Sequence, residues 1–139
     1  MLEKAQGMAV DEAFLDLEDA VAVDAKDAAR RNVVAAARDG DWSGKTLAVR
    51  VNDWTTPWTH RDVVDIVTGA GDRIDTIVLP KADSPHHVAA TDLLLTQVET
   101  AAGLPAKATE VKASTRVIGI AIHHYAMCMS RWLIRYRGF

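Results

Sequence analysis

Charged side chains follow three apolar runs of this chain, at the point where each run ends. Glu18 and Asp19 come after the first run, Arg50 ends the second, and Lys81 follows the third. Because the carboxyl ends of parallel strands meet at one edge of a sheet, we expect these side chains to lie together. Carboxylates can hold a hydrated Mg²⁺, and the planar fork of an arginine suits a substrate carboxylate. The spacing therefore predicts a site at this edge.

Each of these residues also has a purely structural explanation. Arg50 lies inside an apolar run, so its charge needs a partner, which is either Glu18 or Asp19 in an internal salt bridge or a substrate acid group. The two acids are also compatible with a solvated strand end, and Lys81 with a solvated loop. We favour a site because three separate strand ends carry charge. We assign Glu18 and Asp19 as catalytic, Arg50 and Lys81 as substrate-binding, and no residue as a metal ligand.

Strands and helices alternate in the pattern that would bring these residues together. The residues typical of β-strands lie at 14–18, 46–51 and 74–79, and apolar residues at helical spacing lie at 25–37, 59–69 and 84–100. The strands follow one another at about thirty residues, which is the length of one βα unit. This alternation predicts an α/β fold with a parallel sheet.

Residues typical of helix ends mark the boundaries of the three helices. We expect Asp24 and Thr59 to cap the first two, and Ser84 followed by Pro85 to start the third. Glycines end them, at Gly40, Gly71 and Gly103. Residues 1–6 are helix formers and predict an additional short helix.

Composition and charge limit the class of protein. The 139 residues fit one domain, with 49% hydrophobic residues, 25% charged residues and a net charge of -3, which gives no reason to expect a nucleic-acid partner. The single cysteine, Cys128, cannot form an internal disulfide or a thiolate zinc site. There is neither a signal-peptide pattern nor an apolar run that would span a bilayer. We expect a cytoplasmic protein without a membrane partner.

The charge is uneven, and its sign changes near residue 105. Residues 106–139 carry six basic residues and one acid, a net charge of +5, whereas the preceding residues carry -8. We therefore divide the chain into a domain at residues 1–105 and a divergent basic tail at 106–139. In the tail we consider a strand at residues 117–122 and a basic amphipathic segment at 125–136.

Four segments in order resemble the HpcH/HpaI aldolase family, in its citrate lyase beta-subunit-like branch that includes malyl-CoA lyases. They are FLDLEDAV at residues 14–21, AKDAAR at 25–30, VRVN at 49–52 and VLPK at 78–81. The resemblance covers roughly residues 1–105 and implies a partial (β/α)8 barrel in a homo-oligomer. It also implies Mg²⁺ as cofactor and cleavage of a 3-hydroxyacyl-CoA thioester, of the malyl-CoA or citramalyl-CoA type, into a 2-oxo acid and an acyl-CoA.

Matched position by position, Arg50 corresponds to the arginine that binds the 2-oxo acid carboxylate. Glu18 and Asp19 correspond to the acidic pair beside the metal and its waters. The sequence departs from the family where direct metal ligands are expected. VETAAG at residues 98–103 looks like the segment that carries the metal glutamate, but the distance from Lys81 leaves no room for a crossover helix and then a strand. We therefore interpret residues 91–99 as helix.

Neither the metal aspartate nor the Pro-Gly loop that helps to bind CoA has a counterpart. We therefore expect a truncated gene product, incomplete and inactive alone, with an out-of-frame or divergent tail. Two alternatives stay open. The segment FLDLED resembles an aspartyl-phosphate phosphatase motif, but that motif needs a second aspartate where Glu18 stands. The chain is otherwise a non-catalytic fragment or interaction module that uses its basic tail.

Overall fold

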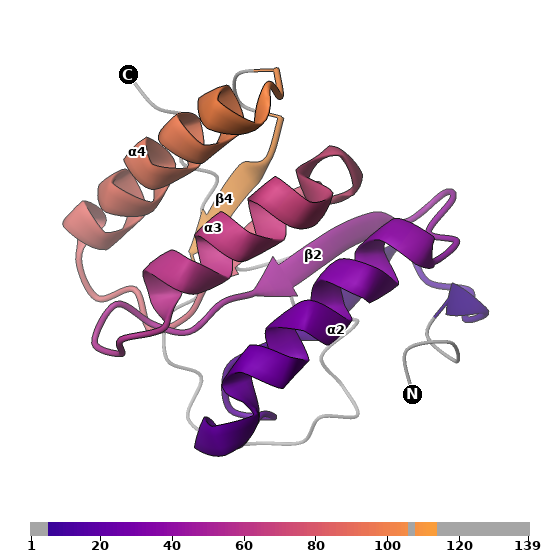
Figure 1. The fold of residues 1–139 in the computed structure, drawn as a ribbon, viewed down its shortest axis with the longest axis horizontal. Coiled ribbons are helices and arrows are strands. Elements are labelled where there is room, and N and C mark those ends of the chain that lie inside the picture. Colours follow the sequence, from indigo (N-terminus) through magenta and orange to yellow (C-terminus); the bar gives the residue numbers. More distant parts are fainter. Residues whose placement is uncertain (1–5, 106–107, 114–139) are drawn as a thin grey trace.

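A computed structural model describes residues 6–105 and 108–113 and shows parallel strands that alternate with helices (Figure 1). The strands are β1 (Glu12–Asp16), β2 (Thr46–Arg50), β3 (Thr76–Leu79) and β4 (Glu110–Ala113). The helices are α2 (Lys26–Asp39), α3 (Thr59–Ala70) and α4 (Pro85–Ala102), with short 3-10 turns η1 (Val23–Ala25) and η2 (Gly71–Arg73). All three predicted strands and all three main helices are confirmed.

The strands lie side by side in the order in which they occur in the chain, β1-β2-β3-β4, and each neighbouring pair is parallel. Figure 1 shows α2, α3 and α4 side by side over one face of this sheet. A doubly wound sheet would reverse its strand order and carry helices on both faces, whereas a (β/α)8 barrel has sequential strands inside a ring of helices. The described residues therefore form part of a (β/α)8 barrel.

The sheet is strongly curved. Glu12 and Lys112 belong to the two outermost strands, yet Lys112 Nζ lies 3.5 Å from Glu12 Oε1. Two side chains from opposite edges of a flat four-stranded sheet would be too far apart to touch, because neighbouring strands lie about 4.8 Å apart. The contact is therefore made across the concave side, as the barrel interior requires.

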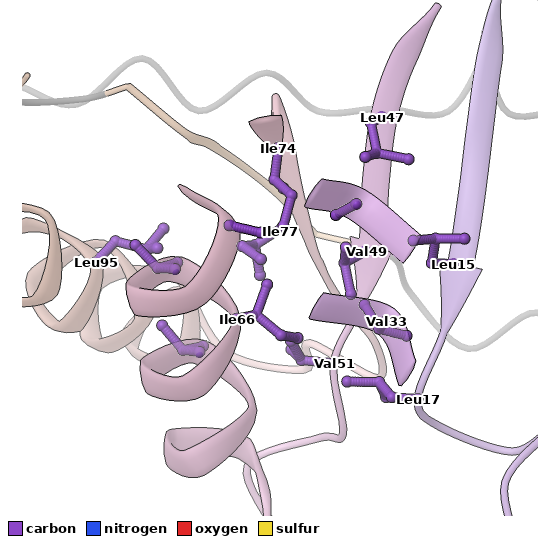
Figure 2. Close-up of a cluster of buried hydrophobic side chains, with 14 of the residues drawn as sticks. Leu15, Leu17, Val33, Leu47, Val49, Val51, Ile66, Ile74, Ile77 and Leu95 are labelled. Atoms are coloured by element: carbon purple, nitrogen blue, oxygen red, sulfur yellow. The ribbon is translucent and has the colours of Figure 1, made fainter. Parts of the chain in front are cut away.

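An apolar cluster fills the space between the sheet and the helices (Figure 2). Alternate strand residues such as Leu15, Val49 and Ile77 pack there against Val33 of α2 and Ile66 of α3. All of them are almost fully buried, which fixes the register of each strand because a slip by one residue would turn them to the other face. The strand ends are thereby held in fixed positions.

The helix boundaries agree with the sequence at α4 and differ at α2 and α3. Ser84 Oγ accepts a hydrogen bond from the His86 N–H at 3.2 Å, and Gly103 ends α4 with a φ of 71°. The predicted caps at Asp24 and Thr59 are wrong. Asp24 lies in η1, before a helix that has no side-chain cap, and the Thr59 hydroxyl donates to the Asp53 carbonyl instead.

Residues 91–99 are helical, as predicted from chain length, because they lie within α4. Glu99 is buried, and its Oε1 accepts a hydrogen bond from the Thr109 N–H at 2.9 Å. Glu99 thus anchors the segment that leads into the amino end of β4, whereas the predicted site lies at the carboxyl ends of the strands. No strand was predicted at β4, and the proposed division at residue 105 stays a prediction.

Several expectations lie outside the described residues, namely most of the helix at residues 1–6 and the segments at 117–122 and 125–136. Among the helices that are described, none combines the length and the apolar character needed to cross a membrane.

Candidate functional site

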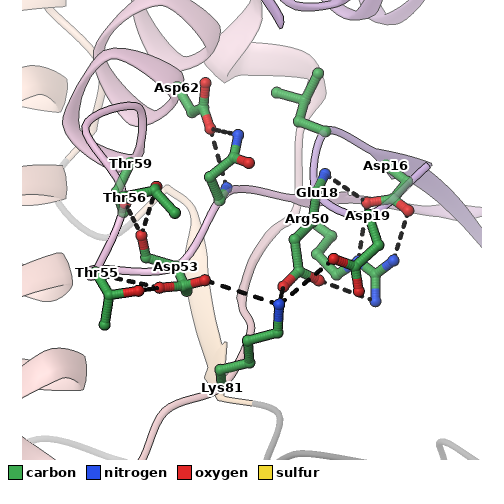
Figure 3. Close-up of polar contacts among 12 residues, drawn as sticks. Asp16, Glu18, Asp19, Arg50, Asp53, Thr55, Thr56, Thr59, Asp62 and Lys81 are labelled. Atoms are coloured by element: carbon green, nitrogen blue, oxygen red, sulfur yellow. Dashed lines mark hydrogen bonds and ion pairs between the residues drawn. The ribbon is translucent and has the colours of Figure 1, made fainter. Parts of the chain in front are cut away.

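The charged side chains at the ends of β1, β2 and β3 meet at one edge of the sheet (Figure 3). Lys81 Nζ lies 2.8 Å from Glu18 Oε1, and Arg50 Nη1 lies 3.3 Å from Glu18 Oε2. The Glu18 side chain is only 5% exposed, so the two cations offset the cost of burying its charge. The predicted convergence of Glu18, Arg50 and Lys81 is confirmed.

Asp16 is the main partner of Arg50, although the sequence analysis considered only Glu18 and Asp19. Asp16 and Arg50 are paired directly in the β1–β2 register. Arg50 Nε donates to Asp16 Oδ1 at 2.9 Å and Nη2 donates to Oδ2 at 2.5 Å. Burial alone would raise the pKa of Asp16, but the hydrogen bonds from Arg50 and from the Glu18 N–H outweigh it and lower the pKa. The hydrogen bonds that Arg50 donates to Asp16 are in turn the main cause that raises the pKa of Arg50.

The guanidinium of Arg50 keeps donors for a further ligand. Within residues 6–105 and 108–113, the contacts with Asp16 and Glu18 use three of the five N–H groups that an arginine carries. One N–H then remains on each terminal nitrogen, beyond those used in these contacts. The Phe14 ring centroid lies 5.7 Å from Arg50 Cζ, which supports the guanidinium plane. Asp16 and Phe14 therefore fix the orientation of the Arg50 guanidinium.

Lys81 reaches the acidic residues from an unusual backbone conformation. Its φ is 50°, a left-handed value that non-glycine residues rarely adopt, directly after Pro80 at the end of β3. Besides Glu18, its Nζ lies 3.4 Å from Asp19 Oδ1 and 3.9 Å from Asp53 Oδ2. The hydrogen bond to Glu18 is the main cause that raises the pKa of Lys81. Lys81 is thus ion-paired with Glu18 and Asp19 at the end of β3, with its side chain 37% exposed.

Besides Asp16, the site contains a further acid that the sequence analysis did not consider, Asp53, and one that is only partly engaged, Asp19. Asp53 is buried after β2, where its Oδ1 accepts a hydrogen bond from the Thr55 N–H at 2.8 Å. Its place directly after Asn52, in the loop that follows a strand, was the available signal. Asp19 is 69% exposed and meets Lys81 alone among the ion pairs of the described residues.

Two polar residues near the predicted edge point elsewhere. Asn52 bonds to Lys26 and Asp62, beneath the site. Asp83 lies 3.2 Å from His87, at the start of α4. The indole of Trp54 donates to Thr91 Oγ1 at 2.9 Å, which makes it a packing residue of the β2–α3 loop.

The acids of this site do not by themselves fit a metal centre. In the part of the chain that the structure describes, no three His, Cys, Asp or Glu side chains lie close enough together to hold a metal ion. The carboxylates of Asp16 and Glu18 already face Arg50 and Lys81. A hard cation such as Mg²⁺ takes oxygen ligands that are free to approach it, so these residues offer acidic surroundings and not a coordination sphere.

Proteins of a known family are similar in sequence to this chain over the residues that form the site. Residues 1–93 match the HpcH/HpaI aldolase/citrate lyase family. An L-malyl-CoA/beta-methylmalyl-CoA lyase of Cereibacter sphaeroides is 46% identical over 103 residues, which are 74% of this chain and 32% of the relative. A (3S)-malyl-CoA thioesterase of the same species is 38% identical over 127 residues, or 87% of this chain and 43% of the relative. The chain thus spans about a third of the length of the lyase and less than half of the thioesterase.

Solved structures share the fold. A Haloferax volcanii malate synthase, in a complex with magnesium and glyoxylate, superposes with a TM-score of 0.72 at 24% identity, covering 81% of this chain and 36% of that one. RipC from Yersinia pestis has a TM-score of 0.54 at 26% identity, covering 78% and 41%. The family match extends over the three strand ends that form the site. The chain belongs to the HpcH/HpaI aldolase/citrate lyase family.

Proposed function

We propose that this chain carries the 2-oxo-acid-binding part of a carbon–carbon lyase that acts on CoA thioesters of 3-hydroxy acids, of the malyl-CoA or citramalyl-CoA type. The observation that carries the proposal is the pair of N–H groups left on Arg50 after Asp16 has fixed its orientation. A guanidinium held in this way suits a planar carboxylate. The products would be a 2-oxo acid, held at Arg50, and an acyl-CoA.

Related proteins support the substrate class more strongly than the reaction. The Cereibacter sphaeroides lyase and thioesterase both carry malyl-CoA in their names, but one name describes carbon–carbon cleavage and the other hydrolysis. We favour the lyase because the more similar relatives carry that name. A carboxylate at Arg50 fits both reactions, since malyl-CoA itself carries one.

The site residues would act through charge and position. Retro-aldol cleavage removes a proton from the 3-hydroxyl and leaves negative charge on the thioester oxygen, which fixed positive groups stabilise. Arg50 would orient the acid end of the substrate, and Lys81 would supply a positive charge beside it. Glu18 is buried between these two cations, so its role would be to hold them in place. Asp19 is 69% exposed, so it would be the carboxylate of the pair that accepts this proton.

Magnesium belongs to this proposal only as a family expectation. Because the described acids do not form a coordination sphere, direct ligands would have to lie outside the described residues, and we assign no step to the metal. The chain alone is therefore expected to bind a 2-oxo acid without turning over a CoA thioester. A homo-oligomer is likewise an expectation from the family.

Calorimetric titration with glyoxylate, with and without MgCl₂, tests the proposal. Wild type should bind glyoxylate, Arg50→Ala should lose the binding, and Arg61→Ala, at an exposed arginine of α3, should keep it. The acids of the described residues should give no saturable heat with MgCl₂ alone, because no three His, Cys, Asp or Glu side chains among those residues lie close enough together to hold the ion. If wild type fails to bind glyoxylate in both buffers, the proposed function is wrong and the fold assignment still stands.

A further inference from the structure

Lys26 is a buried lysine, 6% exposed, that lies below the site at the start of α2. Its Nζ donates three hydrogen bonds of 2.7 Å, to the carbonyls of Leu17 and Glu18 and to Asn52 Oδ1. An ammonium group has three N–H donors, so all of them are used. The Trp58 ring centroid lies 5.4 Å from Nζ, on the loop that leads into α3. Lys26 therefore joins the end of β1 to the loop that follows β2.

Asn52, the partner of Lys26 in the loop after β2, is itself held by hydrogen bonds to Asp62. Asp62 of α3 is 1% exposed, and its Oδ2 accepts hydrogen bonds from the Asn52 backbone N–H at 2.9 Å and from Asn52 Nδ2 at 2.6 Å. The other oxygen of Asp62 accepts from Arg30 Nε at 2.9 Å, on the same helix as Lys26. A continuous set of buried charged hydrogen bonds thus runs from Lys26 through Asn52 and Asp62 to Arg30.

The two carbonyls that Lys26 holds are those that place the Glu18 side chain. Glu18 lies beyond the last residue of β1, so the ladder hydrogen bonds of the strand do not fix it. The Leu17 N–H still donates to the Arg50 carbonyl at 2.9 Å, and the Val21 N–H donates to the Glu18 carbonyl at 3.2 Å. Lys26 holds this short segment through its two carbonyls, and the Glu18 carboxylate contacts Arg50 and Lys81.

We propose that Lys26 is a positioning residue. By holding the backbone at Leu17 and Glu18, it sets the distance between the Glu18 and Arg50 side chains and thereby the affinity of the site for the 2-oxo acid. It does not itself reach the substrate, because its donors are spent on protein acceptors. The effect on affinity rests on the proposed function, whereas the effect on the β1 end does not. The alternative is that Lys26 only stabilises the fold as a whole.

The test compares Lys26→Met, which keeps the length of the side chain and removes the donors, with Val33→Ala, a cavity variant on the same helix. Amide hydrogen exchange is measured at Leu17 and Val21, and glyoxylate affinity by calorimetry. Lys26→Met should lose protection at these two amides and raise the Kd on the order of tenfold, as loss of an orienting partner does. Val33→Ala should lower global stability and leave the glyoxylate Kd unchanged.

The proposal is wrong if Lys26→Met keeps local protection and Kd, or if Val33→Ala raises the Kd equally. If Lys26→Met does not fold, Lys26→Arg replaces it. That variant keeps the charge but has a longer head group that cannot meet the three acceptors in the same way, so a wild-type Kd there would also overturn the proposal. If wild type does not bind glyoxylate, the proposed function fails, and the exchange at Leu17 and Val21 alone decides whether Lys26 positions the β1 end.

Discussion

Replacing Asp16 with asparagine should destabilise the fold and make the loss depend on pH. The substitution removes the negative charge that accepts two hydrogen bonds from Arg50. The Asp16 side chain is 19% exposed and the Arg50 side chain 27% exposed. Hydrogen bonds to charged groups contribute about 1.5–3 kcal/mol, and because this pair is only partly buried we expect a loss of about 2 kcal/mol at pH 7. With a urea m-value of about 1–3 kcal/mol/M for a small domain, the unfolding midpoint should fall by about 1 M.

The sign of the pH effect follows from the lowered pKa of Asp16. A carboxylate whose pKa is lower in the folded state stabilises the fold above its unfolded pKa, which is about 3.9 for aspartate, and loses that contribution as the pH falls through the folded pKa. Urea unfolding of wild type and Asp16→Asn should therefore differ at pH 7 and converge in acid. Asp92→Asn, at an exposed position of α4, should match wild type throughout. Equal midpoints at pH 7, or a difference that persists undiminished in acid, would refute the ion-pair explanation.

Two further substitutions test the packing and the backbone. A Cβ at Gly69 would lie 2.6 Å from Val34 Cγ1, so Gly69→Ala should push α3 away from α2 and lower the free energy of unfolding in urea by about 1–3 kcal/mol. Thr68→Ala, at the neighbouring residue, should have little effect. If Gly69→Ala does not lower this free energy, the two helices are not in close contact there. Because Lys81 has a φ of 50°, the Lys81→Gly variant should be more stable to unfolding than Lys81→Ala by about 1 kcal/mol, although both variants lose the cation. Equal unfolding free energies of the two variants would contradict the left-handed conformation.

The sequence predicted the parts of this fold that depend on local pattern. Apolar β-rich runs become strands, and Ser84–Pro85 and Gly103 mark the ends of α4 because these residue types favour a helix start and a left-handed helix end. Asp24 fails as a cap because it lies in η1, two residues before the first residue of α2, and Thr59 fails because its hydroxyl donates to the Asp53 carbonyl in the preceding loop. β4 was not predicted because four residues, EVKA, are too few to show an alternating pattern.

The site was predictable in its location and only partly in its pairing. Three consecutive parallel strands place their carboxyl ends at one edge of the sheet, so the approach of Glu18, Arg50 and Lys81 could be predicted. The partner of Arg50 depends on which residue of β1 stands opposite it, and that register is set by the core packing of side chains such as Leu15 and Val49. Asp16 was therefore not recognised as the partner from sequence alone.

The most direct test of the central claim follows the Arg50 guanidinium itself. In an NMR titration of ¹⁵N-labelled protein with glyoxylate, the terminal Nη signals of Arg50 should shift with saturation, while the Nε signal, engaged by Asp16, should move much less. Methyl glyoxylate, which lacks the carboxylate charge, should leave both unchanged. If glyoxylate leaves the Nη signals unchanged, or if the methyl ester shifts them as much, Arg50 does not bind the 2-oxo acid carboxylate.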